Sequence, residues 1–349
     1  MKKLLITGGA GFVGSNLARA LHGQYTITVL DNFHRRGSEH NAHQLRNSSI
    51  TVIRGDVRSP DDLTAAGDFD VLIECSADPS VQAGINDSPE YLIQTNLGGA
   101  LHCAELCRQR GRGMIFLSTS RVYPFAPLQQ AHYRETPTRY ELEPQQTVPG
   151  LTTAGVSEAF PLAGERSLYG ATKLAAELVL LEYRHAYRLP FLINRCGVLA
   201  GPGQFGTSEQ GVVAHWIAAH VFNRPLCYIG FGGTGKQVRD LLHVADLAEL
   251  IRFQLEHPAL FLDGVFNVGG GREVSLSLCE LTNLCRQTVG RTVPLTSDPQ
   301  SRYADIPIYL TDTSRLRSVC DWQPRHLAED IIRDTCKWMT QTPDLANYF

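Results

Sequence analysis

Two hydroxyl side chains, Ser118 and Thr119, end an apolar run that begins at Met114, and the motif Tyr169-Gly-Ala-Thr-Lys173 follows far downstream. Tyr169 and Lys173 lie four positions apart, so on a helix both point from the same face. An ammonium group beside a phenol stabilises the phenolate, which can take a proton from an alcohol while a hydride leaves the same carbon. Alone, this pair is a weak signal. It indicates alcohol oxidation only if a hydride acceptor binds nearby.

A glycine-rich stretch offers a site for such an acceptor. The sequence TGGAGFVG begins at Thr7, after a strand-like run and before a helix-like one, which is the context in which this motif is informative. Its glycines permit a tight turn, and the amide groups at the helix start can bind a pyrophosphate. Asp31 lies 23 positions after Gly8, where a carboxylate can accept both ribose hydroxyls of NAD. Arg35 and Arg36 keep NADP as an alternative, and we predict NAD.

The elements that must position these residues alternate along the chain. Short apolar runs occur at 4–7, 26–30, 50–54, 71–75, 114–119, 191–196 and 265–268, and most are separated by stretches with helical spacing, such as 14–21, 91–110 and 169–187. This order predicts an α/β fold with a Rossmann-type doubly wound parallel sheet. The glycine-rich and aromatic sequence after position 196 predicts a smaller mixed α/β substrate-binding lobe. We expect the NAD-binding domain at 1–196 and 240–270, and the lobe at 197–239 and 271–349.

Composition excludes several classes of protein. The chain has 349 residues, of which 43% are hydrophobic and 19% charged, as in globular proteins. Its 32 basic and 35 acidic residues give a net charge of -3, so we expect no nucleic-acid partner. The first apolar run is too short for a signal peptide or a membrane span. The nine cysteines form no Cys-x-x-Cys pair. We therefore expect a cytoplasmic protein with no membrane association and no bound metal.

Together these motifs resemble the extended short-chain dehydrogenase/reductase family over nearly the whole chain. The matching features are the glycine loop, Asp31, Asp56, Asn96, Thr119, Tyr169 with Lys173, and the stretch GKQVRDLLHVADL at 235–247. The resemblance implies that Thr119 hydrogen-bonds the reacting oxygen and that Ser118 lies against the nicotinamide. Asp56 fits an adenine contact, although a carboxylate here could also cap a turn.

The resemblance also suggests which residues hold the substrate. Arg239 and Arg302 correspond to family arginines near a nucleotide diphosphate, since the planar guanidinium pairs with phosphate oxygens. Either could instead form a surface ion pair. Arg195, at a strand end, fits a structural ion pair or a nucleotide contact. Glu74 stands where the family commonly has histidine, and the sequence predicts no role for it.

The reaction can be narrowed by what is missing. Family members that dehydrate sugars carry an Asp-Glu pair after the strand threonine, and the sugar-acid decarboxylases keep a glutamate there. In this chain Ser120 and Arg121 occupy those places. What remains is hydride transfer with one proton shuttle, in a simple dehydrogenation or an epimerisation.

The inserted sequence narrows the resemblance further. Tyr169 lies 50 positions after Thr119, which is long for the family, and the inserted segments YRETPTRYELE and GVSEAFPLAGERSLYGATK look like those of CDP-paratose 2-epimerases, also called tyvelose epimerases. The later segments GQFGTSEQGVVAHW and GGTGKQVRDLLHV are similar to the substrate-lobe segments of that subfamily. That resemblance implies a nucleotide-diphosphate sugar oxidised at C2 by tightly held NAD, with hydride returned to the opposite face. The alternatives are a UDP-sugar 4-epimerase, another nucleotide-sugar dehydrogenase of the family, and a non-enzymatic NAD-binding regulator. The family also suggests a homodimer.

The resulting site prediction has three parts. The catalytic residues are Thr119, Tyr169 and Lys173. The cofactor-binding residues are Gly8, Gly11, Phe12, Val13, Asp31, Asn32, Asp56, Val57, Ser76, Asn96, Ser118, Tyr169 and Lys173. The substrate-binding residues are Thr119, Arg195, Gln204, Arg239 and Arg302.

Overall fold

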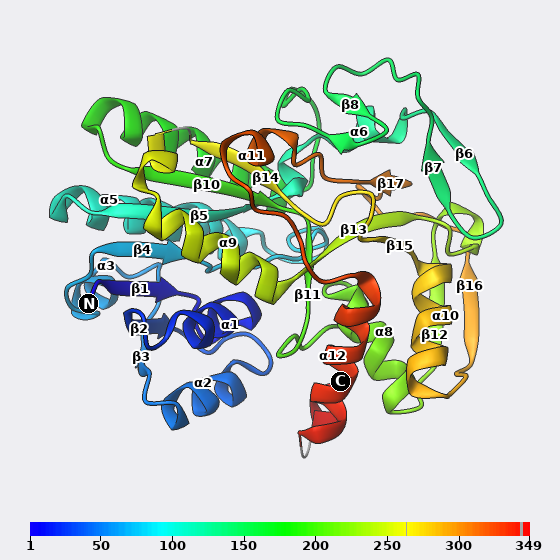
Figure 1. Cartoon of the computed structure of the whole chain (residues 1–349), viewed down its shortest axis with the longest axis horizontal. Coiled ribbons are helices and arrows are strands. Elements are labelled where there is room, and N and C mark those ends of the chain that lie inside the picture. The colour runs from blue at the N-terminus through cyan, green and yellow to red at the C-terminus, as the bar shows by residue number, and fades with distance from the viewer. Residues whose placement is uncertain (263, 343–344) are drawn as a thin grey trace. The chain divides into compact units, whose positions relative to one another are not determined.

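The computed structural model describes residues 1–262, 264–342 and 345–349, which form two compact units (Figure 1). The first unit comprises Met1–Val122, Leu168–Arg195 and Leu247–Phe266. The second comprises Tyr123–Ser167, Cys196–Asp246 and Asn267–Phe349.

These units differ from the predicted domain boundaries mainly at 123–167, which the sequence analysis assigns to the NAD-binding domain. Backbone hydrogen bonds tie this segment to the second unit. The Val156 amide donates to the Leu310 carbonyl at 2.8 Å, and the Tyr140 amide to the Lys236 carbonyl at 3.0 Å. Such pairings join residues distant in sequence, so composition alone did not show them.

A seven-stranded sheet forms the centre of the first unit, in the order β14-β10-β5-β4-β1-β2-β3. The strands are β1 (Lys3–Thr7), β2 (Thr26–Asp31), β3 (Thr51–Arg54), β4 (Val71–Glu74), β5 (Gly113–Thr119), β10 (Phe191–Cys196) and β14 (Val265–Val268). β1 pairs in parallel with both β2 and β4. The strand order reverses there, and in doubly wound sheets ligands bind at the carboxyl ends of strands beside such a reversal. The predicted fold class is confirmed.

Helices connect these strands. They are α1 (Phe12–Leu21), α2 (Ser38–Asn47), α3 (Pro60–Ala65), α4 (Glu90–Ile93), the π-helical η1 (Gln94–Gly99), α5 (Ala100–Arg110), the 3₁₀ turn η2 (Ser120–Val122), α7 (Leu168–Tyr187), α9 (Val244–Glu256) and the 3₁₀ turn η4 (Pro258–Leu262). The expected helix at 91–110 is thus divided by a π-helical segment, a feature frequent at functional sites. A cluster of buried side chains joins α5 and α7 to the strands and includes Leu72, Cys103, Phe116 and Leu180.

The second unit is a mixed α/β assembly, as predicted, but it is not smaller than the first, because it also includes residues 123–167. Its strands are β6 (Tyr133–Glu135), β7 (Tyr140–Leu142), β8 (Leu151–Thr152), β9 (Gly155–Val156), β11 (Val198–Ala200), β12 (Leu226–Ile229), β13 (Val238–His243), β15 (Ser275–Ser277), β16 (Leu295–Asp298) and β17 (Ile308–Tyr309). β13 pairs in parallel with β11 and β17 and antiparallel with β15.

Its helical elements are α6 (Phe125–Gln129), α8 (Val212–Val221), η3 (Phe231–Gly233), α10 (Leu278–Val289), α11 (Ser314–Val319), α12 (Ala328–Gln341) and η5 (Leu345–Tyr348). A core that includes Trp216, Leu281 and Ile331 joins α8, α10 and α12.

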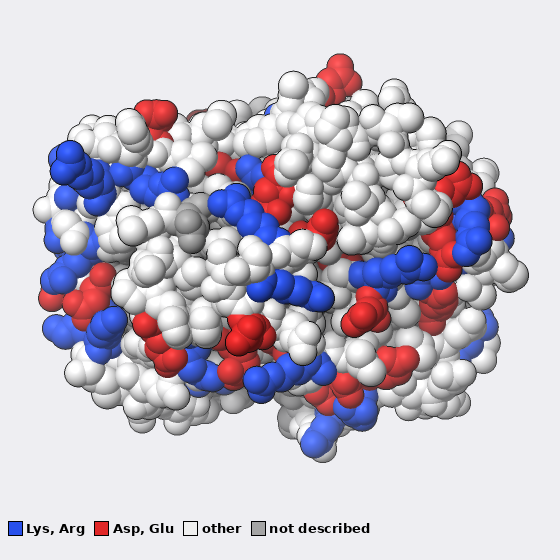
Figure 2. All heavy atoms as spheres, turned by 45° about the horizontal axis from the view of Figure 1, so that its top comes forward, with Lys and Arg blue, Asp and Glu red and all other residues white. Residues whose placement is uncertain are grey.

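Two further properties concern the surface and the length of the helices. On the face shown in Figure 2, acidic and basic side chains are intermixed in small groups, consistent with the near balance of charges. Among the described residues, none of the helices combines the length and the apolar character that a membrane crossing requires.

Candidate active site

The glycine loop joins β1 to α1 and packs too closely for side chains at Gly8, Gly9 and Gly14. Gly8 has a φ of +61°, and a Cβ there would lie 2.7 Å from the Ser76 Cα. A Cβ on Gly14 would lie 2.5 Å from the Gly8 carbonyl oxygen. Gly11 precedes α1, which Phe12 and Val13 open. A Cβ on Gly9 would likewise lie 2.7 Å from the Ile6 carbonyl oxygen, so three positions of the loop leave no room for a side chain. The loop therefore brings bare backbone and the amide groups of a helix start together, an arrangement that fits a pyrophosphate.

Asp31, the last residue of β2, is buried beside this loop. Its Oδ2 accepts a hydrogen bond from the Ala10 amide at 2.9 Å, and its Oδ1 accepts one from the Phe33 amide at 2.8 Å. Burial raises the pKa of Asp31, and these backbone hydrogen bonds oppose that rise by favouring the charged form. A buried carboxylate at the end of the second strand is the group expected to meet the ribose of NAD.

Asp56 lies in a second carboxylate network after β3. The Asn32 amide nitrogen donates to its Oδ2 at 2.9 Å, and Arg58 Nη2 contacts the same oxygen at 2.7 Å. Burial alone would raise the pKa of Asp56, but the hydrogen bonds from Arg58 and Asn32 outweigh it and lower the pKa to about 2. The Arg58 amide also donates to Oδ1 at 2.9 Å, so the alternative of turn capping is realised here. Val57, next in the chain, is buried.

Asn96 lies in the π-helical segment and bridges two parts of the first unit. Its Oδ1 accepts from the Asp78 amide at 2.8 Å, and its Nδ2 donates to the Asp78 carbonyl at 2.9 Å and to Thr172 Oγ1 at 3.3 Å. The side chain thus ties the loop after β4 to α7. Ser76 lies in that loop, against the glycine turn.

Helix α7 carries the proposed proton-handling pair and packs against β5 and η2. Tyr169 and Lys173 are both buried, as is Thr119 at the end of β5. Thr119 Oγ1 accepts from the Arg121 amide at 3.2 Å. The Lys173 ammonium lies 3.6 Å from Glu74 Oε2 and 3.8 Å from the centre of the Phe116 ring.

One turn further along α7, Glu177 organises a second buried network. Arg195 Nη2 and Nε contact Glu177 Oε2 at 2.7 and 3.1 Å, and Ser118 Oγ donates to Glu177 Oε1. Arg195 is therefore in the structural ion pair that is one of the two roles its sequence position allows. Sequence analysis missed Glu177, although its spacing of four from Lys173 put it on the same helix face.

The predicted substrate residues of the second unit are Gln204, Arg239 and Arg302. Arg239 Nη2 contacts Asp305 Oδ1 at 2.8 Å, and Arg302 Nη1 donates to the Ser208 carbonyl at 2.8 Å. Gln204 Nε2 donates to the Leu199 carbonyl at 3.2 Å. Among the described residues, none hydrogen-bonds to the buried Gln204 Oε1.

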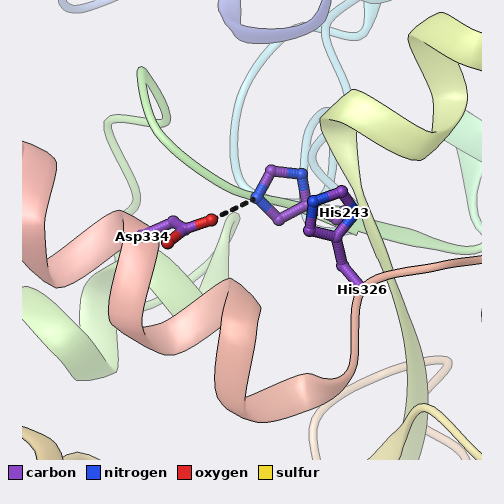
Figure 3. Close-up of side chains that lie close together, drawn as sticks. All are labelled: His243, His326 and Asp334. Carbon is purple, nitrogen blue, oxygen red and sulfur yellow. Dashed lines mark ion pairs between the residues drawn. The ribbon is translucent and has the colours of Figure 1, made fainter.

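His243, His326 and Asp334 form a cluster in the second unit with the composition of a metal site (Figure 3). His243 Nδ1 accepts from the Ala245 amide at 3.0 Å, so the neutral ring carries its proton on Nε2, which lies 3.7 Å from Asp334. That nitrogen then has no lone pair to offer a metal ion. His326 Nδ1 is 2.8 Å from Asp246 Oδ1. These contacts suit a structural cluster that joins β13, α9 and α12.

Comparisons with known proteins identify the family. The model of the NAD dependent epimerase/dehydratase family matches residues 4–269. The chain is 32% identical to CDP-paratose 2-epimerase of Salmonella typhi, over 96% of this chain and 98% of that protein. It is 26% identical to UDP-glucose 4-epimerase of Corynebacterium glutamicum, over 93% and 91% of the two chains. Among solved structures, UDP-glucose 4-epimerase of Thermus thermophilus in complex with NAD superposes with a TM-score of 0.78 at 26% identity, covering 97% and 99%. The chain belongs to the NAD dependent epimerase/dehydratase family.

Proposed function

We propose that this protein is a nucleotide-sugar epimerase of the CDP-paratose 2-epimerase type. The observation that carries the proposal is the 32% identity to the Salmonella typhi enzyme along almost the full length of both chains. Ser120 and Arg121, which follow the strand threonine, supply neither the acid nor the base that an elimination of water needs. This favours epimerisation over dehydration.

NAD fits the first unit because a bare glycine turn, a helix start and the buried Asp31 lie together there. When bound, NAD accepts a hydride and returns it to the same carbon. The protein side chains carry out the proton transfer and position the reacting oxygen. Tyr169 takes the proton of the sugar hydroxyl and later gives it back, Lys173 stabilises the phenolate, and Thr119 hydrogen-bonds the reacting oxygen.

The other contacts follow the same proposal. The cofactor contacts are those of Gly8, Gly11, Phe12, Val13, Asp31, Asn32, Asp56, Val57, Ser76, Asn96, Ser118, Tyr169 and Lys173. Gln204, Arg239 and Arg302 bind the nucleotide-diphosphate sugar, where the buried Gln204 Oε1 is an acceptor for a hydroxyl or an amino group. We further propose a homodimer formed through α5 and α7. Exposed apolar side chains on α7, Leu178 and Tyr187, support it.

The substrate can be identified with a panel of CDP-, UDP-, GDP- and dTDP-sugars, followed by NMR in ordinary and deuterated water. We expect a CDP-sugar to be inverted at C2 with no deuterium at that carbon, because the hydride is returned by the bound cofactor. Inversion of a UDP-sugar at C4 would instead make the protein a UDP-sugar 4-epimerase. Deuterium at the inverted carbon would contradict the hydride mechanism.

Tyr169→Phe tests the assigned base. We expect turnover to fall by about 10²-fold or more, the usual contribution of a positioned acid or base, while NAD still copurifies with the protein. The matched control is Tyr187→Phe, on the exposed end of the same helix, which should keep wild-type turnover. Full activity of Tyr169→Phe on the identified substrate would refute the assignment.

A further inference from the structure

Glu74 is a buried carboxylate for which the sequence offered no role. It is the last residue of β4 and only 1% exposed, and its Oε2 lies 3.6 Å from the equally buried ammonium of Lys173. The two residues are 99 positions apart in the chain. The contact therefore depends on packing α7 over the carboxyl end of β4.

Each partner makes the burial of the other tolerable. Taking a carboxylate or an ammonium out of water costs several kcal/mol even after relaxation, and an uncompensated buried charge is strongly destabilising. Burial raises the pKa of Glu74, whereas the Lys173 charge and the Ser76 amide act in the opposite direction. The Lys173 charge thus favours the ionised form of Glu74.

The surroundings restrict where the lysine ammonium can lie. A lysine side chain is a flexible four-carbon stem, but here Phe116 from β5 presents its ring 3.8 Å from Nζ while Glu74 contacts it from β4. The other nearby carboxylate on the helix, Glu177, is already paired with Arg195 and Ser118. Glu74 is therefore the counter-charge that fixes Lys173.

We propose that Glu74 is a positioning residue for the proton transfer: its carboxylate holds the Lys173 ammonium charged and in place one helical turn from the phenol of Tyr169. This rests on the proposed roles of Tyr169 and Lys173. On this proposal, the glutamate at the end of β4, where the family commonly has histidine, acts electrostatically on Lys173.

Other ionisable groups surround the pair, but each is neutral, lies one helical turn away or is itself paired. Cys103 faces it from α5, and burial raises the pKa of that thiol well above its usual range, so it stays neutral. Tyr169 and Glu177 lie on α7, one turn to either side of Lys173. Arg195 on β10 is neutralised by Glu177. Substitution of Glu74 is therefore the change that most directly removes the negative charge next to Lys173.

The test is the pH dependence of kcat in Glu74→Gln. Without its counter-charge the buried ammonium gives up a proton more readily, and the neutral amine no longer helps the phenol to ionise. We expect the acidic limb of the profile to move to higher pH by about one unit, so that kcat at neutral pH falls about tenfold, while KM changes little. NAD content, measured on the denatured protein, reports whether the cofactor site is intact.

Two variants separate this effect from loss of folding. Asp246→Asn removes another carboxylate that is 1% exposed, one paired with His326. It should lower the melting temperature without moving the acidic limb. Glu74→Asp keeps the charge on a shorter stem, so the limb should stay near its wild-type position while kcat falls several-fold. If Glu74→Gln does not fold, this variant decides, and wild-type kcat in Glu74→Asp would overturn the positioning role.

Parallel measurement of Tyr169→Phe distinguishes the two levels of the proposal. An unchanged profile and kcat in Glu74→Gln, with Tyr169→Phe inactive, would overturn the role of Glu74 alone. An active Tyr169→Phe would remove the proposed function itself, whatever Glu74→Gln does.

Discussion

Asp31 serves the glycine loop as well as the proposed cofactor. One carboxylate oxygen accepts the Ala10 amide of the loop, and the other accepts the Phe33 amide after β2. The same residue therefore shapes the loop and presents negative charge where a ribose is expected. A substitution that removes the carboxylate leaves the buried Ala10 amide and the half-buried Phe33 amide without their acceptor.

We expect Asp31→Ala to weaken NAD binding by about 10-fold to 150-fold, since a hydrogen bond to a charged group, here from the ribose hydroxyls to the carboxylate, contributes about 1.5–3 kcal/mol. The preference for NAD over NADP should shrink at the same time, because the charge that repels a 2′-phosphate is gone. Titration of NAD-free protein with both cofactors measures the two effects. Asp61→Ala, at an exposed position in the first turn of α3, is the control and should bind NAD normally. Equal NAD affinity in both variants would contradict the role of Asp31.

At the level of single residues, motif spacing predicts what lies near in sequence and misses what packing brings together. Tyr169 and Lys173 could be paired because helix geometry fixes residues four apart. The partners Glu74 and Glu177 could not be assigned to Lys173 and Arg195, because those contacts depend on how α7 sits on the sheet. For the same reason the sequence allows Arg195 two roles.

At the level of elements, the end of β13 and the start of α9 are joined by contacts of His243. His243 ends β13 and accepts the Ala245 amide at the start of α9, and its ring stacks on that of His326 with centroids 4.3 Å apart. Burial lowers the pKa of His243, and His326 lowers it further, while Asp246, Asp334 and Asp330 act in the opposite direction. The folded protein thus favours the neutral ring.

This predicts a loss of stability in mild acid. The unfolded chain binds the proton near the usual histidine value of about 6.5, whereas the folded chain binds it only at lower pH. Stability therefore falls as pH drops below that value. Relative to His243→Asn, whose amide oxygen can still accept the Ala245 amide but does not titrate, wild type should lose of the order of 1 kcal/mol between pH 7 and 5 for each unit of pKa shift. Urea unfolding at several pH values measures it, and parallel curves for the two proteins would argue against the shift.

Element prediction worked best for the buried sheet. Strands of a parallel sheet are covered on both faces, so they appear as continuous apolar runs, and all seven expected strands are present. The helix at 91–110 was expected to be continuous because a π-helical segment at Gln94–Gly99 barely alters the helical spacing. The short hairpins β6–β7 and β8–β9 are too brief to give a periodic signal.

At the scale of the whole molecule, the proposed homodimer can be tested at the exposed apolar residues of α7. Leu178 is 56% exposed although it is large and apolar, and such residues are common at subunit contacts. We expect Leu178→Glu to shift the protein from dimer to monomer in sedimentation or light-scattering measurements, because a buried charge at an interface is costly. Leu262→Glu, at a residue 73% exposed in η4, should leave the dimer intact. A dimer that survives Leu178→Glu would place the contact elsewhere.

Tyr169, Lys173 and Glu177 occupy successive turns of α7. The rise of the helix, about 6 Å for every four residues, therefore fixes the distances between them along the helix axis. Insertions before Leu168, where α7 begins, do not change these distances. The long connecting segments can therefore change in sequence and length, and with them the sugar preference, while the spacing of the proton-transfer residues on α7 stays the same.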